Sequence, residues 1–251
     1  MSMRPLVVVP TYNELDNLPP LVERILADPA FSVLVVDDAS PDGTGRVAQE
    51  LAERFPGRMQ VLHRSGKQGL GTAYLAGFRY ALEHRFDPVI EMDADFSHDP
   101  ADLPRLLQAA RDADLVLGSR YVPGGRTENW SRTRRLISRF GCWYSRTVLG
   151  LPYRDLTGGF KCFRRRTLEI LDLERVHSNG YSFQIELTYR CHRRGLKIVE
   201  VPIVFRERRS GRSKMSKGIV LEAMLLVWRL RLGNRSGPDV KSEVLKRGAN
   251  D

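Results

Sequence analysis

The chain has 251 residues, of which 42% are hydrophobic, and a formal net charge of +10 at pH 7. This size and composition suit one α/β domain with a sizeable core and exclude a chain that is disordered throughout. We expect neither a signal peptide nor a membrane span, because Leu6–Val9 is short and Glu222 interrupts the apolar stretch Ile219–Trp228, whereas a span needs roughly 20 apolar residues.

The first half of the chain alternates short apolar runs with amphipathic stretches. The apolar runs predict strands near residues 6–9, 33–36, 60–62, 89–92 and 115–117. Apolar residues at helical spacing predict helices near residues 15–27, 44–55, 70–84 and 101–111. Short buried strands separated by helices indicate an α/β fold with a mostly parallel, Rossmann-like sheet and helices on both faces.

The second half is less regular. Its pattern predicts a helix at 134–148, a strand at 159–163, a helix at 182–194, a strand pair over 197–206 and a final amphipathic helix at 217–232. Residues 233–251 are polar and contain Gly, Ser and Pro, so we expect a flexible tail. The sequence therefore predicts one domain over residues 1–232.

The charge is distributed unevenly along the chain. Residues 1–118 contain 11 Lys and Arg against 18 Asp and Glu, a net −7, and residues 119–251 contain 29 against 12, a net +17. Basic residues often only solvate a surface, but this excess also suits an anionic partner such as nucleic acid, membrane or phosphate. The charge alone does not choose among them.

Acidic and polar residues follow three of the predicted strands. These segments are Pro10–Glu14, Asp37–Gly43 and Asp93–His98. Ligands of parallel sheets bind beyond the carboxyl ends of the strands. Asp93 and Asp95 are two residues apart, so an extended backbone would point both carboxylates the same way, which suits a hard cation such as Mg²⁺ or Mn²⁺.

Other interpretations apply to some of these residues. Asp42 or Thr44 can cap the second helix, and Asp99 begins the fourth. A dinucleotide fingerprint is absent after the first strand, and Gly66-Lys67 lacks the spacing of a P-loop. Gly69–Thr72 either approaches a ligand or is simply a flexible start of a helix.

Several segments together resemble the inverting GT-A glycosyltransferases, and in particular the dolichol-phosphate and polyprenol monophosphomannose synthases. The first group is Pro10–Glu14, Val36–Thr44, Gly69–Ala73 and Asp93–Asp95. The second group, which narrows the resemblance, is Gly118–Tyr121, Gly124-Gly125, Asn129-Trp130, Asp155–Phe160, Gly180–Gln184 and Glu200–Ile203. The similarity extends from about residue 5 to residue 230.

The resemblance implies transfer of mannose from GDP-mannose to a polyprenyl monophosphate with inversion, by a GT-A domain. Its nucleotide-sugar half would be residues 1–118 and its acceptor half residues 119–232. The nucleoside would bind at Pro10, Tyr12, Glu14, Val36 and Asp38. Asp93, Ala94 and Asp95 would bind the metal and the diphosphate, with Ser97 as a further metal position.

The resemblance also assigns basic residues. Arg120, Arg134, Arg208 and Lys214 would contact the donor diphosphate or the acceptor phosphate, with Ser138 on the acceptor side. We expect Asp95, Arg120 and Arg134 to carry catalysis, because alignment and charge stabilisation are enough for an acceptor that is already ionised. Residues 206–217 combine basic residues with Ser and Gly, which predicts a loop that orders when the donor binds.

The helix at 217–232 leaves two possibilities. Its apolar stripe and Trp228 suit a membrane interface, but most amphipathic helices pack on their own domain. We expect a cytoplasmic protein with reduced Cys142, Cys162 and Cys191 that meets the cytoplasmic face of the membrane peripherally or through a separate membrane subunit.

Three alternatives stay open. A polyprenyl-phosphate glucosyltransferase that uses UDP-glucose differs only in the donor pocket. A basic nucleic-acid-binding protein would explain the pI of 9.8 but lacks a recognition module. An inactive relative that serves as a subunit is disfavoured by the intact acidic loops. His98 and Asp155 can each be structural or can orient a ligand.

Overall fold

The computed structural model describes residues 3–176, 178, 180–207 and 217–233. A seven-stranded sheet has the order β3-β2-β1-β4-β7-β5-β8, and β6 and β9 form a separate pair. The strands are β1 (Leu6–Thr11), β2 (Ser32–Asp37), β3 (Met59–His63), β4 (Val89–Glu91), β5 (Leu115–Ser119), β6 (Arg126–Glu128), β7 (Lys161–Phe163), β8 (Ile198–Pro202) and β9 (Val204–Arg206). The helices are α1 (Leu18–Leu26), α2 (Thr44–Arg54), α3 (Leu70–Glu83), α4 (Leu103–Ala109), α5 (Arg132–Leu149), α6 (Arg165–Ile170), α7 (Gly180–Arg193) and α8 (Lys217–Gly233).

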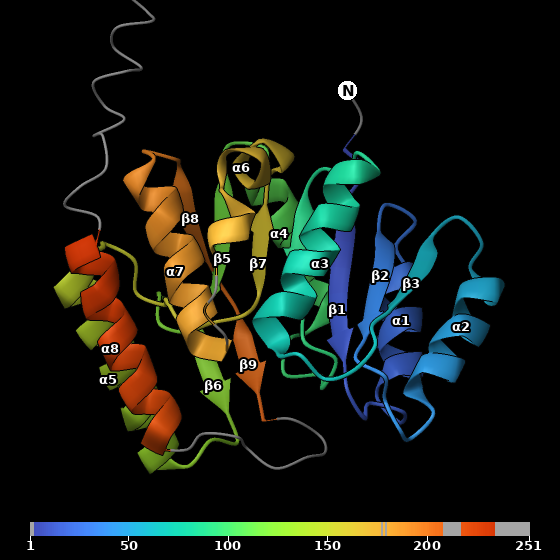
Figure 1. Ribbon diagram of the computed structural model, residues 1–251, viewed down its shortest axis with the longest axis horizontal. Coiled ribbons are helices and arrows are strands. Elements are labelled where there is room, and N and C mark those ends of the chain that lie inside the picture. Colours follow the sequence, from blue (N-terminus) through green and yellow to red (C-terminus); the bar gives the residue numbers. More distant parts are fainter. Residues whose placement is uncertain (1–2, 177, 179, 208–216, 234–251) are drawn as a thin grey trace, which may run out of the picture.

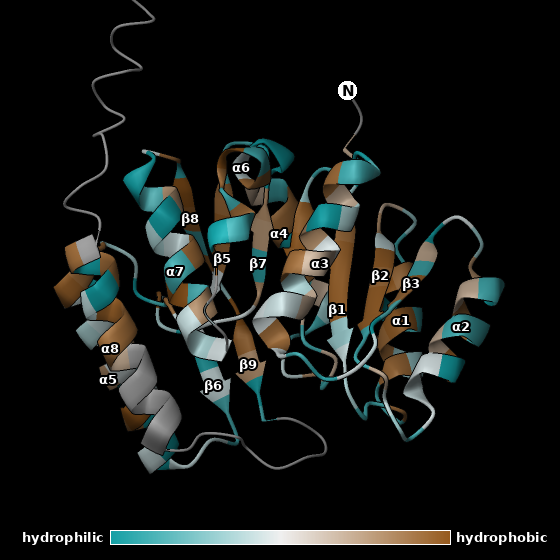
Figure 2. Ribbon diagram, viewed as in Figure 1, coloured by the Kyte–Doolittle hydropathy of each residue, from teal (hydrophilic) through white to brown (hydrophobic). Residues whose placement is uncertain are grey.

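Helices cover both faces of this sheet, as the sequence predicts (Figure 1). Successive residues of β1 point to opposite faces, so Val7 and Val9 pack with α1, α2 and α4, whereas Leu6 and Val8 pack with α3, α6 and α7. Figure 2 shows the hydrophobic residues concentrated in the strands between these layers. The two apolar clusters hold the strand ends, and hence the loops that follow them, in fixed positions.

One of the strand predictions for the second half is confirmed and one is wrong. The predicted strand at 159–163 forms β7, which lies antiparallel between β4 and β5. The predicted strand pair at 197–206 does form two strands, but they do not pair with each other. Instead β8 pairs with β5 in the main sheet, and β9 pairs with β6, a strand that the sequence pattern did not predict.

Helices α5 and α8 lie side by side at one edge of the molecule (Figure 1). A third apolar cluster joins them to α7 through Leu149, Ile185 and Val227. No helix in the described ranges is long and apolar enough to cross a membrane. The three cysteines are free and buried.

Helix α3 approaches β1 unusually closely. A Cβ atom on Gly77 would lie 2.4 Å from Cγ1 of Val8, so only glycine permits this contact. The close contact brings Tyr74, one turn earlier on α3, to the carboxyl end of β4.

Candidate active site

The loops after β1 and β2 are joined side by side. The parallel register pairs Pro10 with Val36. The Ser40 hydroxyl accepts a hydrogen bond from the backbone N–H of Asn13 at 3.1 Å, and Thr44 Oγ1 accepts one from Glu14 at 3.0 Å. This edge therefore brings together all five residues that the sequence predicts for the nucleoside, namely Pro10, Tyr12, Glu14, Val36 and Asp38.

The two adjacent aspartates after β2 have different surroundings. The carboxylate of Asp37 accepts hydrogen bonds from Thr11 at the end of β1 and from Ser40 in the loop after β2. Asp38 forms a bidentate ion pair with Arg64 at 2.6 and 2.8 Å. Asp37 therefore stabilises the loop, and Arg64 fixes the orientation of Asp38.

Lys67 lies at the same edge. Its Nζ is 3.9 Å from the centre of the Tyr12 ring, a cation–π contact. The sequence analysis considered Lys67 only as part of a P-loop and missed this role. Its cationic group lies beside the predicted nucleoside site, where a diphosphate would be attracted to it.

The segment after β4 is a turn and not the extended backbone that we expected. Phe96 has a φ of 62°, and the backbone N–H of Ser97 donates to Asp95 Oδ1 at 3.0 Å. Asn13 and Ala39, in the loops after β1 and β2, also have positive φ values, of 61° and 53°. Such conformations are costly for residues other than glycine and cluster at functional sites.

Asp93 is held from two sides. Its Oδ1 atom accepts a hydrogen bond from the Tyr74 hydroxyl at 3.0 Å, and its backbone N–H donates to His98 Nδ1 at 3.2 Å. Burial lowers the pKa of His98 to about 4, so the imidazole is neutral and can accept this bond. His98 thus has the structural role that the sequence left open, since it orders the turn.

The donor atoms of this turn fit a hard cation. Asp93 and Asp95 supply carboxylate oxygens, and the hydroxyl of Ser97 is buried without a hydrogen-bond partner among the described residues. No group of three or more His, Cys, Asp or Glu side chains in the described residues could hold a metal by itself. A cation here would need further oxygen ligands, and the phosphates of a nucleotide would supply them.

Arg120 is almost fully buried and paired with Asp155. The two nitrogens that face Asp155 lie 2.7 Å from its oxygens, and Nη2 also donates to Thr157 at 2.8 Å. The segment from Asp155 continues to Gly159, where a Cβ atom would be 3.8 Å from an oxygen of Asp93. Asp155 thus orients Arg120 beside the acidic turn.

Arg134 and Ser138 come from the first turns of α5. Arg134 forms an ion pair with Glu207 at 2.9 Å, and its guanidinium carbon lies 4.2 Å from the centre of the Trp130 ring. Ser138 accepts a hydrogen bond from the Tyr121 hydroxyl at 2.7 Å. The predicted residues Arg208 and Lys214 lie outside the described residues, as does most of the predicted loop 206–217; Arg206 at its start belongs to β9.

A buried polar cluster that the sequence analysis missed lies behind the acidic turn. Lys161 on β7 donates to the backbone carbonyl of Gln184 at 2.6 Å and to Thr188 at 2.9 Å. Glu91 at the end of β4 is also fully buried, which raises its pKa to about 8. Glu91 lies opposite Lys161 in the pairing of β4 with β7, so the cluster joins β4, β7 and α7 two residues before Asp93.

Comparison with known proteins places this site in a family. Residues 6–171 match the family described as Glycosyl transferase family 2. The chain is 53% identical to an undecaprenyl-phosphate mannosyltransferase of Micrococcus luteus over 93% of its own length and 96% of that protein. It is 50% identical to a polyprenol monophosphomannose synthase of Mycolicibacterium smegmatis, over 92% and 88% of the two chains. The chain belongs to the polyprenol/dolichol-phosphate mannose synthases of glycosyl transferase family 2.

Solved structures confirm the GT-A type of fold expected for this family. A glucosyl-3-phosphoglycerate synthase of Mycobacterium tuberculosis, in complex with Mn²⁺, UDP and glucosyl-3-phosphoglycerate, has a TM-score of 0.68 at 21% identity, covering 92% of this chain and 80% of that one. A mannosyltransferase of Pyrobaculum calidifontis, in complex with GDP-mannose and Mn²⁺, has a TM-score of 0.55 at 17% identity, over 98% and 79% of the chains. These identities are low, so the likeness establishes the fold alone.

Proposed function

We propose that the chain transfers mannose from GDP-mannose to a polyprenyl monophosphate with inversion, giving polyprenyl-phosphate mannose and GDP. The observation that carries this proposal is the 53% identity to an undecaprenyl-phosphate mannosyltransferase over nearly the whole of both chains. The geometry supports it, because three polar strand-end loops meet at one edge beside a basic second half.

The donor side of the site is the edge formed by the loops after β1 and β2. Pro10, Tyr12, Glu14, Val36 and Asp38 would hold the nucleoside. The ion pair with Arg64 already orients the Asp38 side chain in the absence of nucleotide. The free-energy cost of ordering this side chain on binding is therefore small. Lys67, held over Tyr12, would attract the diphosphate.

The acidic turn would hold the diphosphate through Mg²⁺ or Mn²⁺. Asp93, Asp95 and Ser97 are the proposed metal ligands, with Ala94 beside the diphosphate. A divalent cation bound there supplies Lewis-acid stabilisation of the negative charge that develops on the departing GDP. The protein holds the turn in place through Tyr74 and His98, so that the carboxylates are oriented before the donor binds.

The acceptor side would be formed by Arg134 and Ser138 at the start of α5. A phosphate monoester is ionised at neutral pH and needs no general base, so its alignment with the donor sugar is the main task of this side. Arg120 would stabilise charge between the donor and acceptor phosphates from its position beside the turn. Arg208 and Lys214 belong to the same proposal.

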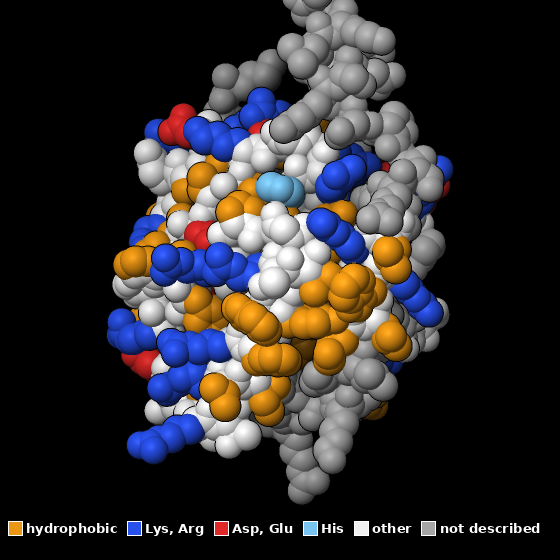
Figure 3. Space-filling view, turned by 90° about the vertical axis from the view of Figure 1, so that its left-hand side faces the viewer, with side chains coloured by type: hydrophobic (Ala, Val, Ile, Leu, Met, Phe, Trp, Pro, Cys, Tyr) orange, Lys and Arg blue, Asp and Glu red, His pale blue; other side chains and the backbone are white. Residues whose placement is uncertain are grey.

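The lipid acceptor requires a membrane, and one surface of the molecule suits it. Seven exposed apolar side chains belong to α5 and α8, and Figure 3 shows hydrophobic side chains gathered on this side of the molecule. We call these residues the apolar face: Leu136, Ile137, Phe140, Trp143, Leu225, Trp228 and Leu232, between 41% and 71% exposed. Such a patch is unusual for a monomer free in solution. We propose that it rests on the cytoplasmic face of the membrane; a separate membrane subunit stays a prediction.

A panel of radiolabelled donors tests the reaction. With polyprenyl phosphate and Mn²⁺, we expect transfer from GDP-mannose and none from UDP-glucose or UDP-GlcNAc. A chelator should abolish transfer, and Asp95→Asn should lower it roughly a hundredfold or more. Asp112→Asn removes an exposed carboxylate elsewhere and should have no effect.

The other outcomes are equally informative. Transfer from UDP-glucose would favour the glucosyltransferase alternative. Transfer in the presence of chelator would refute the metal-dependent mechanism. Salt-dependent DNA binding without any sugar transfer would favour the nucleic-acid-binding alternative.

A further inference from the structure

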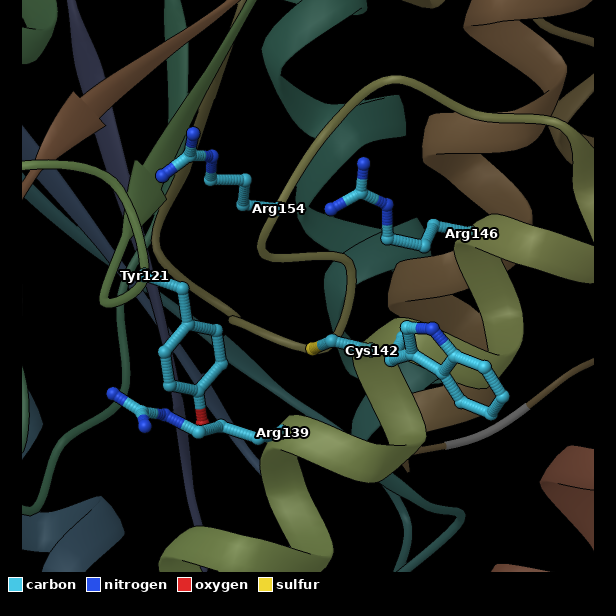
Figure 4. A pocket seen from close by; sticks show the side chains of 6 residues that line it. Tyr121, Arg139, Cys142, Arg146 and Arg154 are labelled. Carbon is cyan, nitrogen blue, oxygen red and sulfur yellow. The ribbon is translucent and has the colours of Figure 1, made fainter.

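A small basic pocket opens on the flank of α5 that faces away from α8. It has a volume of ≈ 240 Å³ and is lined by Tyr121, Arg139, Cys142, Trp143, Arg146 and Arg154. These side chains come from three segments, namely the loop after β5, helix α5 and the stretch that follows α5 (Figure 4). Tyr121 donates a hydrogen bond to Ser138 of the proposed acceptor side, and the other five side chains belong to none of the proposed donor, metal and acceptor sites.

In the part of the chain that the structure describes, the three arginines of the pocket have no counter-ions. Most arginines near the candidate site are paired with carboxylates, as Arg120 is with Asp155 and Arg134 with Glu207. In contrast, the guanidinium groups of Arg139, Arg146 and Arg154 make no ion pair or hydrogen bond with any other described residue. Positive charges that line one pocket repel one another unless an anion lies between them. One guanidinium group can donate hydrogen bonds to two phosphate oxygens at once, so a phosphate group suits the pocket.

The size of the pocket limits the ligand. Sites for small molecules usually have volumes of about 300–1,000 Å³. A volume of ≈ 240 Å³ is therefore small for a nucleotide and suits a single phosphate group with bound water. The inner wall is Cys142, whose sulfur lies 3.3 Å from Thr157 Oγ1. The pocket thus backs onto the segment that holds Arg120.

The position of the pocket indicates where such a phosphate comes from. Trp143 lines the pocket and also belongs to the apolar face, where its ring lies 5.7 Å from that of Phe140. Figure 3 shows Lys and Arg side chains beside the apolar patch. If the apolar face rests on a membrane, the pocket opens at the level of the lipid headgroups. Tryptophan is itself enriched at this boundary.

We propose that this pocket binds the phosphate of an anionic phospholipid headgroup, and that it orients the protein on the membrane. The proposal rests on the membrane contact proposed above, and it adds a lipid site separate from that of the acceptor. Inorganic phosphate presents the same anion as a phospholipid headgroup. The experiment must therefore distinguish binding of a headgroup from binding of free phosphate.

Vesicle co-sedimentation tests the proposal with Arg146→Gln/Arg154→Gln, measured on the full chain. We compare vesicles of phosphatidylcholine with vesicles that also contain phosphatidylglycerol. The wild type should favour the anionic vesicles, and the double variant should lose this preference roughly tenfold. Binding to pure phosphatidylcholine should not change, because the apolar face is intact.

Two controls distinguish specific binding in the pocket from a general effect of positive surface charge. Arg79→Gln/Arg111→Gln removes the same charge from exposed arginines on α3 and after α4, and should retain most of the preference. Arg146→Lys/Arg154→Lys keeps the charge but loses the paired geometry of guanidinium, and should lose much of the preference. An equal loss in the two Gln double variants, or full retention in the Lys variant, would overturn the proposal.

Calorimetry with inorganic phosphate identifies the source of the anion. Heat of binding that disappears in Arg146→Gln/Arg154→Gln, together with an unchanged preference for anionic vesicles, would assign the pocket to free phosphate and overturn the lipid assignment. The vesicles contain no polyprenyl phosphate, donor or metal. The result is therefore independent of whether the protein transfers mannose.

Discussion

The carboxylate of Asp155 forms a bidentate ion pair with the guanidinium of Arg120, with two N···O distances of 2.7 Å and side chains only 0% and 3% exposed. The Arg120 backbone N–H donates to the same carboxylate at 2.9 Å. The charge of Arg120 is therefore compensated within the protein. A phosphate would meet a fixed, pre-oriented arginine that already has a partner.

Removal of the Asp155 charge should destabilise the fold. Asp155→Asn leaves the Arg120 guanidinium buried without a counter-ion, which costs about 3–5 kcal/mol in the free energy of unfolding. Urea denaturation measures this loss. Asp172→Asn breaks the exposed pair with Arg175 and should cost less than about 1 kcal/mol. Equal losses in the two variants would contradict the importance of the buried pair.

The contribution of Asp155 to the free energy of unfolding should also depend on pH. Burial raises the pKa of Asp155, but the charge and hydrogen bonds of Arg120 outweigh this effect and hold it below its ordinary value of 3.8. A carboxyl whose pKa is lowered by folding adds stability above its unfolded pKa and loses it as the pH falls through the folded pKa. The difference in unfolding free energy between wild type and Asp155→Asn should therefore narrow below about pH 3.8. A constant difference from pH 7 to the acid transition would contradict this assignment.

Tyr74 should act as a positioning residue for Asp93. Its hydroxyl donates to Asp93 Oδ1 at 3.0 Å and keeps its proton, because burial and the Asp93 charge raise the pKa of Tyr74 well above 10.0. Tyr74→Phe should weaken Mn²⁺ binding about tenfold in the presence of GDP, measured by electron paramagnetic resonance of free Mn²⁺. Tyr80→Phe, on the same helix, serves as the control. Unchanged Mn²⁺ affinity in Tyr74→Phe would show that this bond does not orient the ligand.

Ser97 offers a separate test of the proposed metal site. Its hydroxyl is buried and makes no hydrogen bond to a described residue, so Ser97→Ala should leave the unfolding free energy within about 1 kcal/mol of wild type. If the hydroxyl binds the cation, directly or through water, Mn²⁺ affinity should fall several-fold. A loss of stability with unchanged Mn²⁺ affinity would assign Ser97 a purely structural role.

The sequence predicts the framework of the site but not the contacts that orient it. Apolar runs and helical spacing are local properties, and they placed the loops after β1, β2 and β4 at one edge of the sheet. The pair Arg120–Asp155 joins residues 35 positions apart, and Tyr74 reaches Asp93 over 19 positions. No local spacing encodes such contacts, because they depend on which strands become neighbours.

The burial of Lys161 is a property that the local pattern does not predict. Lysine is rarely fully buried, so a lysine in a short strand would ordinarily suggest a surface position. Instead β7 enters the middle of the sheet, and Lys161 is buried with hydrogen bonds to Gln184 and Thr188. Partners on a distant helix make this burial possible. The apolar face was likewise missed in part, because the sequence drew attention to α8 and not to α5.

The apolar face gives the most direct test of the membrane contact. Leu136→Ser/Phe140→Ser removes two side chains that are 71% and 50% exposed, so the folded state loses little packing. Their transfer into the membrane interface is worth about 1.5–3 kcal/mol each when complete, so binding to phosphatidylcholine vesicles should fall tenfold or more. Leu70→Ser/Ile170→Ser removes two exposed apolar side chains on α3 and α6 and should bind like wild type. Truncation after residue 216 removes α8 and should weaken binding further, because α8 supplies three residues of the apolar face. Equal binding by all four proteins would rule out this face as the membrane contact.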